Sequence, residues 1–133
     1  MEISKRLIED GQIMKISIGD KYDEQTESVS RSSELDIECQ AYFVEVVKSV
    51  FEFRHSKILV DMTNIVYIDS SGLWALFEGH KEAGRNKGKV AFLNPTKDVK
   101  RVLDVTGMSS KLIIFETESD AIASLKSHEV KAR

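Results

Sequence analysis

The 133-residue chain has one cysteine, one proline and three histidines. A lone cysteine, Cys39, cannot form an internal disulfide, and so few histidines argue against a dedicated zinc site. No apolar run approaches the roughly 20 residues that a membrane-spanning helix requires. The N-terminal segment also lacks the long apolar core and the small-residue cleavage site of a secretory signal. We therefore expect a cytoplasmic protein with no metal, no cofactor and no membrane insertion.

The composition is that of a folded globular protein, with 41% hydrophobic and 31% charged residues. The length fits one domain over residues 1–133. A net charge of −3 argues against direct binding of nucleic acid. Basic residues nevertheless gather between positions 81 and 101, namely Lys81, Arg85, Lys87, Lys89, Lys97, Lys100 and Arg101. This stretch could meet an acidic partner or a phosphate, or it could simply solvate a face.

The N-terminal part alternates apolar and polar residues over 3–9 and 12–19, which predicts two strands. The sequence Glu9-Asp10-Gly11 between them is typical of a hairpin turn. Residues 20–33 are polar and rich in serine, with almost nothing to bury. We expect this stretch to be a long polar loop or a mobile insertion.

Further along, the hydrophobic period switches repeatedly between helix and strand spacing. Helices are expected over 36–54, 71–86, 95–106 and 119–127, strands over 57–62, 65–68, 89–93 and 112–115, and a flexible tail over 128–133. Strands that alternate with helices imply crossover connections and a mostly parallel sheet. The predicted fold is α/β, with a central sheet of about four or five strands, helices packed against it, and the N-terminal hairpin at one edge.

The motif Asp69-Ser70-Ser71-Gly72 lies where a predicted strand passes into a helix. Serine and aspartate are common helix caps, so the motif could be a capping sequence and nothing more. The other interpretation is chemical, because a hydroxyl at a helix start is exposed and can accept a phosphoryl group. The added phosphate would then face the positive end of the helix dipole.

The run ILVDMTNIVYIDSSGLWAL, followed by KGKVAFLNPTKDVKRVLDVTGMSSKLIIFETESDAIASL, resembles the STAS domain of anti-sigma-factor antagonists. Members of that family carry an apolar strand, a D-S-S/T-G-L turn and a helix, followed by a V-x-x-x-L-x-x-x-G helix and a closing strand and helix. Val99, Leu103 and Gly107 match the later helix. The resemblance covers about residues 36–127. The departure lies upstream, where Ser33-Glu34-Leu35-Asp36 replaces the family's G-x-L-D element and follows the polar stretch 20–33.

The resemblance implies that Ser70 is the phosphoacceptor and that the domain itself performs no catalysis. A serine kinase that doubles as an anti-sigma factor would bind the unmodified protein and phosphorylate it, and a metal-dependent phosphatase would reverse the modification. Asp69 would orient the turn or contact the kinase, Ser71 would cap the helix, and Gly72 would allow close backbone approach. Asp36 would lie near the same partner surface.

Two alternatives remain open beside this phosphorylation-gated, partner-switching module. One is a STAS accessory subunit of a membrane transport complex, which need not be phosphorylated. The other is a small enzyme using Ser70, although no Ser/His/Asp set is recognisable in the sequence.

A helical wheel separates two faces of the helix after this motif. Trp74 falls on the same side as Glu78, Lys81 and Arg85, opposite an apolar face expected to hold Leu73, Leu76, Phe77, His80, Ala83 and Gly84. A tryptophan among charges beside the motif is a candidate interface anchor, because tryptophan is enriched in binding hot spots. It could equally cover the edge of the core.

Overall fold

The computed structural model describes residues 2–19, 21–23, 25–26, 28–30, 33–35, 40–53 and 55–127, and the side chains of 21, 22, 28–30 and 33 are not described. Predictions for Cys39, Asp36 and the tail 128–133 therefore lie outside the described residues. Within the described ranges, no helix is both long and apolar enough to span a bilayer.

The chain begins with an antiparallel hairpin of β1 (Glu2–Ile8) and β2 (Ile13–Gly19). Its turn places Glu9, Asp10 and Gly11 at positive φ angles of 54°, 57° and 84°. Aspartate and glycine tolerate this left-handed region better than most residues. The predicted hairpin and its turn are confirmed.

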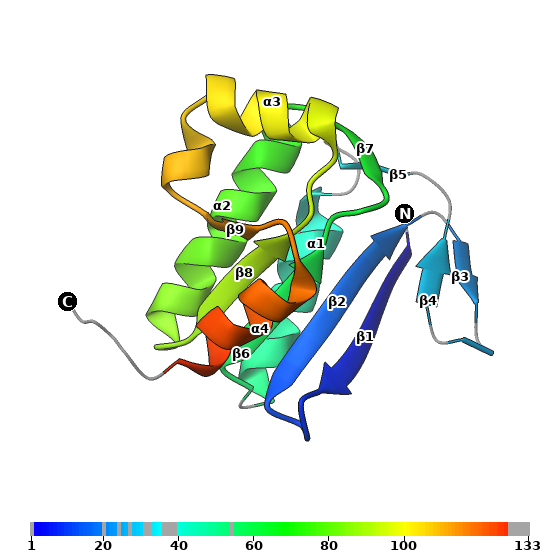
Figure 1. Ribbon diagram of the computed structural model, residues 1–133, viewed down its shortest axis with the longest axis vertical. Helices are drawn as coiled ribbons and strands as arrows, with labels where there is room; N and C mark the ends of the chain where they lie inside the picture. The colour runs from blue at the N-terminus through cyan, green and yellow to red at the C-terminus, as the bar shows by residue number, and fades with distance from the viewer. Residues whose placement is uncertain are drawn as a thin grey trace.

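The central sheet has five strands in the order β1-β2-β6-β8-β9 (Figure 1). β6 (Lys57–Asp61), β8 (Lys89–Leu93) and β9 (Ile113–Phe115) run parallel to β2, and β1 alone is antiparallel. The hairpin thus forms one edge, as the sequence predicts. The strand β7 (Ile65–Ile68) leaves this sheet and pairs instead with β5 (Ser33–Leu35).

Helices cover the two sheet faces unequally (Figure 1). α1 (Gln40–Glu52) and α2 (Ser70–Arg85) cover one face, and their buried side chains form the larger core with residues such as Ile16, Val60 and Phe92. α4 (Glu118–Lys126) covers the other face over a smaller cluster. α3 (Lys97–Val105) lies across the end of the sheet from which α2 begins, and the 3₁₀ turn η1 (Met108–Ser110) follows it.

Two predicted elements need correction. The stretch 20–33 is not simply a loop, because β3 (Lys21–Asp23) and β4 (Ser28–Ser30) form a second, two-stranded hairpin beside the N-terminal one. α3 begins at Lys97 rather than at Pro95, since Thr96 is its N-cap and its hydroxyl accepts a hydrogen bond from Val99 N. Pro95 therefore precedes the helix and does not lie in its first turn.

Candidate functional site

The motif forms the first turn of α2, and Asp69 is its N-cap. The Asp69 backbone is extended, with φ −109° and ψ −172°, and its Oδ1 accepts a hydrogen bond from Gly72 N at 3.0 Å. Its backbone carbonyl accepts a second bond from Leu73 N at 2.9 Å. The expectation that Ser71 caps the helix is wrong, because an acceptor must precede the helix to reach the amides of its second and third residues. Ser70 and Ser71 are the first two helical residues.

Gly72 holds this turn against β5. A Cβ atom on Gly72 would lie 2.2 Å from the Leu35 carbonyl oxygen and 2.7 Å from Ile68 Cγ1, so only glycine fits. The Asp69 amide also donates to the Leu35 carbonyl oxygen at 3.4 Å. The close backbone approach expected of Gly72 is therefore present, and its partner is the backbone of β5. The position of the turn is set by glycine packing and by the pairing of β5 with β7.

The two serines differ in exposure. Ser70 is exposed, whereas Ser71 is half-buried beside it. Since a phosphoryl donor must reach the hydroxyl, this difference favours Ser70 as the acceptor. A phosphate there would lie at the N-terminus of a 16-residue helix, where the helix dipole stabilises negative charge.

The buried face of α2 is rotated from the predicted one. Its buried residues are Gly72, Ala75, Leu76, Gly79 and Ala83. Leu73, Phe77 and His80 are only half-buried, and Gly84 is exposed. The His80 ring stacks on Phe77 with centroids 6.2 Å apart, and burial lowers the pKa of His80. Trp74 lies on the outer side, as the wheel indicates, with 48% of its surface exposed.

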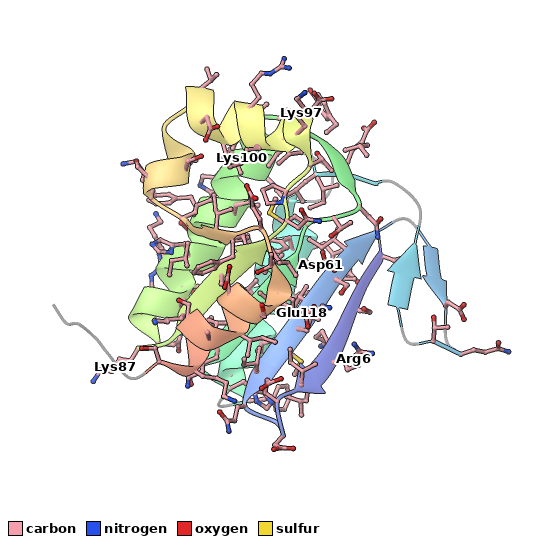
Figure 2. The ribbon with its side chains drawn as sticks, viewed as in Figure 1. Arg6, Asp61, Lys87, Lys97, Lys100 and Glu118 are labelled. Carbon is pink, nitrogen blue, oxygen red and sulfur yellow. The ribbon has the colours of Figure 1, made fainter. Side chains whose placement is uncertain are left out.

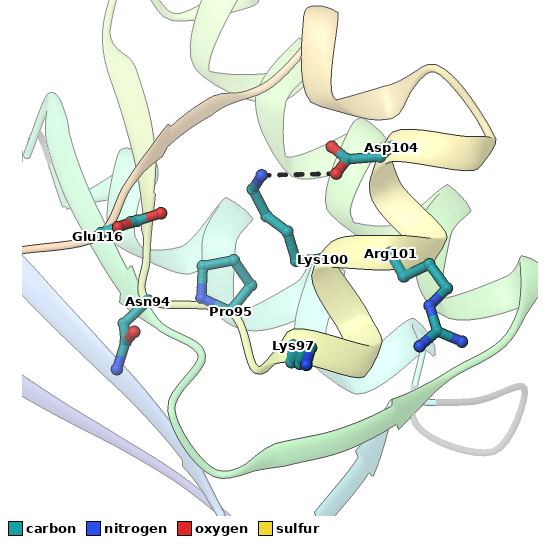
Figure 3. A pocket seen from close by; sticks show the side chains of 7 residues that line it. All are labelled: Asn94, Pro95, Lys97, Lys100, Arg101, Asp104 and Glu116. Carbon is teal, nitrogen blue, oxygen red and sulfur yellow. Dashed lines mark ion pairs between the residues drawn. The ribbon is translucent and has the colours of Figure 1, made fainter.

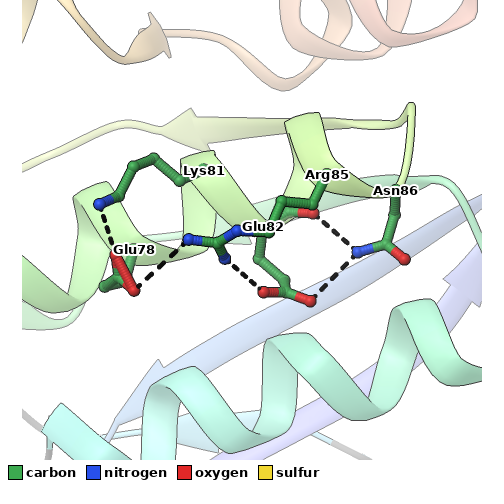
Figure 4. A network of polar contacts seen from close by, with 5 residues as sticks. All are labelled: Glu78, Lys81, Glu82, Arg85 and Asn86. Atoms are coloured by element: carbon green, nitrogen blue, oxygen red, sulfur yellow. Dashed lines mark hydrogen bonds and ion pairs between the residues drawn. The ribbon is translucent and has the colours of Figure 1, made fainter.

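A polar network occupies the outer side of α2 beyond Trp74 (Figure 4). Glu78 pairs with Lys81 at 2.8 Å and, more loosely, with Arg85 at 4.0 Å. Arg85 also pairs with Glu82 at 2.7 Å, and the Asn86 side-chain amide donates to Glu82. The hydrogen bond from Lys81 is the main cause that lowers the pKa of Glu78. The Glu78 carboxylate therefore remains charged near neutral pH.

The basic stretch 81–101 does not form one surface. Lys81 and Arg85 belong to the α2 network, whereas Lys97 and Lys100 are residues of α3 and Lys87 lies at the opposite end of the sheet (Figure 2). A hollow of about 490 Å³ adjoins α3, lined by Asn94, Pro95, Lys97, Lys100, Arg101, Asp104 and Glu116 (Figure 3).

Charges of both signs meet in this hollow. The Lys100 ammonium points into it and lies 3.5 Å from Asp104 Oδ2. The pKa of Asp104 is lowered mainly by a hydrogen bond from Ser109 and to a smaller extent by the charge of Lys100. Lys100 therefore shares the hollow with a carboxylate partner. Among the residues described, no three His, Cys, Asp or Glu side chains are arranged to hold a metal ion.

The structure thus brings together Asp69, Ser70, Ser71 and Gly72 in one turn, with Trp74 one turn further along α2. Asp36 lies outside the described residues. The sequence interpretation did not foresee that Leu35 contacts this turn through its backbone carbonyl, since backbone pairing leaves no residue-type signature. The wheel, however, already indicated that Lys81 and Arg85 share the side of Trp74.

These features define a class of fold: an α/β domain with a mostly parallel five-stranded sheet, in which a tightly packed turn presents an exposed serine at the start of a helix. The STAS domain family model matches residues 24–121. The chain belongs to the STAS family.

Known proteins resemble the chain in sequence and in fold. An anti-sigma F factor antagonist of Paenibacillus polymyxa is 28% identical over 69 residues, which cover 52% of this chain and only 59% of that relative. A proposed anti-sigma factor antagonist of Thermotoga maritima has a similar structure, with a TM-score of 0.74, 21% identity, and coverage of 94% of this chain and 95% of its own. The unphosphorylated anti-sigma factor antagonist SpoIIAA gives a TM-score of 0.64 at 16% identity, and the match covers 95% of this chain and 99% of SpoIIAA. At such identities the two structures show the fold alone.

Proposed function

We propose that this protein is an anti-sigma-factor antagonist, a binding module rather than an enzyme, whose association with a serine-kinase anti-sigma factor is controlled by phosphorylation of Ser70. The observation that carries the proposal is the exposed Ser70 hydroxyl at the first position of α2, in a turn fixed by Asp69 and Gly72. The relatives described above support the same role. They include SpoIIAA structures in unphosphorylated and phosphorylated forms.

The switch acts on binding more than on folding. A phosphoserine adds about −1.5 to −2 charge and three acceptor oxygens. At the start of α2 this charge is locally favourable, so the domain stays folded. When the same group is buried against a partner it must lose its hydration, which disfavours the complex. A loss of about 3 kcal/mol weakens association more than a hundredfold.

Asp69, Ser71, Gly72 and Trp74 complete the proposed partner surface, with Asp36 as the family-based addition. Asp69 and Gly72 position the acceptor, and Trp74 offers an apolar side chain one turn away. A metal-dependent serine phosphatase restores the unmodified form. In this proposal the kinase and the phosphatase carry the catalytic groups.

The decisive experiment incubates the protein with each purified serine-kinase anti-sigma factor of its own genome and ATP, followed by intact mass measurement. We expect one kinase to add a single phosphate to the wild type and to Ser71→Ala, and none to Ser70→Ala. Labelling of Ser70→Ala would move the acceptor elsewhere. Absence of both labelling and binding with every kinase would contradict the proposal and favour the transport-accessory alternative.

A second measurement uses calorimetric titration with that kinase. Ser70→Asp should bind more weakly than wild type, although a carboxylate carries less charge than a phosphate and is a partial mimic. Trp74→Ala should bind more weakly by about 2 kcal/mol if the ring is buried in the complex. Wild-type affinity of Trp74→Ala would remove Trp74 from the partner surface.

A further inference from the structure

We infer that the partner surface continues from Ser70 along the outward side of α2 to Lys81 and Arg85, and that the kinase contacts these two cations with carboxylates. This inference rests on the proposed function and names the chemistry of the partner. We call the set Ser70, Trp74, Phe77, Lys81 and Arg85 the outward stripe of α2.

Helix geometry aligns the outward stripe. Its members are spaced by four, three, four and four residues, so they lie within one narrow sector of a 3.6-residue helix. The fifteen residue-to-residue steps from Ser70 to Arg85 correspond to a length of about 22 Å. The buried residues of α2, including Leu76 and Ala83, lie on the opposite side. Four members of the stripe, Ser70, Trp74, Lys81 and Arg85, are exposed, and Phe77 between them packs partly against the core. The exposed members share one side of the helix, which begins at the proposed phosphoacceptor.

The middle of the stripe is apolar. Trp74 is 48% exposed, and Phe77 beside it is half-buried. Lys81 Nζ lies 5.1 Å from the centroid of the Phe77 ring, which places a cation over an aromatic face. A partner that buries Trp74 must therefore also approach Lys81.

The far end of the stripe presents positive charge, although its ion pairs are formally balanced. The side chains of Lys81 and Arg85 are 44% and 53% exposed, whereas those of Glu78 and Glu82 are only 18% and 17% exposed. The cations are therefore more accessible to a partner than the carboxylates with which they pair (Figure 4). Charge complementarity calls for a partner with acidic side chains at this position.

The two ends of the stripe act separately. Lys81 and Arg85 lie more than about 15 Å from Ser70 along the helix, which is farther than charges interact through physiological salt. The acidic partner side chains therefore add affinity at the far end of the stripe, and a phosphate on Ser70 acts on the part of the partner that it touches.

The test uses the kinase that labels Ser70 and compares two pairs of substitutions with the same charge change. The variant Lys81→Glu/Arg85→Glu should bind at least tenfold more weakly, with a slower association rate and a weaker dependence on salt. The control Lys5→Glu/Arg6→Glu alters exposed residues of β1, at the far edge of the sheet, and should bind nearly as wild type. The neutral pair Lys81→Gln/Arg85→Gln, which adds no repulsion to Glu78 or Glu82, should bind with an intermediate affinity. Melting curves verify folding.

The outcomes separate the inference from the function on which it rests. If Lys81→Glu/Arg85→Glu binds like the β1 control while Ser70→Asp still weakens the complex, the inference is wrong and the proposed function stands. If no kinase binds the wild type, both fail. If only the α2 variants lose affinity, and the glutamate pair loses more than the glutamine pair, the acidic partner surface is supported.

Discussion

The two sides of α2 have opposite demands on side-chain size. Toward the core, small residues let the helix approach its neighbours closely: Gly72 meets the backbone of Leu35, and a Cβ on Gly79 would lie 3.3 Å from the Phe43 ring. Toward solvent, Trp74 is 48% exposed, and the side chains of Lys81 and Arg85 are 44% and 53% exposed. The inner side therefore fixes where the helix lies, and the outer side is left to vary with the partner. Substitutions on the two sides should separate stability from binding.

The largest expected difference compares Leu76→Ala with Trp74→Ala. Leu76 is fully buried, so its truncation should lower the free energy of unfolding by about 3 kcal/mol. Trp74 is half-exposed, and its truncation should cost under about 1 kcal/mol despite the larger side chain. Urea denaturation of both variants measures this. Equal losses would mean that Trp74 belongs to the core and would break the comparison.

The next comparison uses two glycines of the same helix. Gly72→Ala should destabilise the fold by about 2 kcal/mol, because its Cβ would clash with the Leu35 carbonyl oxygen. Gly84→Ala, whose Cβ would have no neighbour within 4 Å, should instead stabilise it by about 0.5–1 kcal/mol through helix propensity. Chemical denaturation tests the opposite signs. A stable Gly72→Ala would show that β5 does not hold the turn.

Much of this could be predicted from the sequence, because the hydrophobic period reports burial directly. The predicted hairpin, the strand at Lys89–Leu93 and the helix after Asp69 follow from alternating or helical spacing of large apolar residues. The same reliance on large apolar residues makes the predicted buried side of α2 wrong in part. Gly72, Ala75 and Gly79 are small and contribute little to an apolar pattern, although they pack most closely.

Other features left no local signal. β3 and β4 contain mostly polar residues, and their pairing comes from the backbone, which residue type does not report. The strand β7 looks like a sheet strand in sequence, yet it pairs with β5 through a register shift between Ser33 and Glu34. The position of the candidate site depends on that long-range pairing. The motif from Asp69 to Gly72 is therefore recognisable in the sequence, whereas the β5 backbone that supports it is not.

A smaller effect distinguishes the true cap from its neighbour. Asp69→Ala removes the acceptor for Gly72 N and should cost about 1 kcal/mol of stability. Asp69→Asn keeps a side-chain oxygen and should cost much less, and Ser71→Ala should remain within about 0.5 kcal/mol. Thermal unfolding of the three variants measures these differences. A larger loss in Ser71→Ala than in Asp69→Ala would reverse the assignment of the cap.

The smallest effect concerns His80, at the border between the two sides of α2. Burial lowers the pKa of His80, so the folded protein disfavours the charged imidazolium. The unfolded chain binds that proton with an ordinary pKa of about 6.5, and it therefore binds more protons than the native state between the two pKa values. Stability should rise with pH across this window and fall as the protein is acidified below about pH 6.5. Glu78, whose pKa is lowered by Lys81, loses its own contribution to stability only at more acidic pH.

His80→Gln should flatten the dependence of unfolding free energy on pH between about pH 7 and pH 5, where histidine titrates. If the slope of unfolding free energy against pH does not change, the imidazole remains hydrated in the folded protein and lies on the outer side with Trp74.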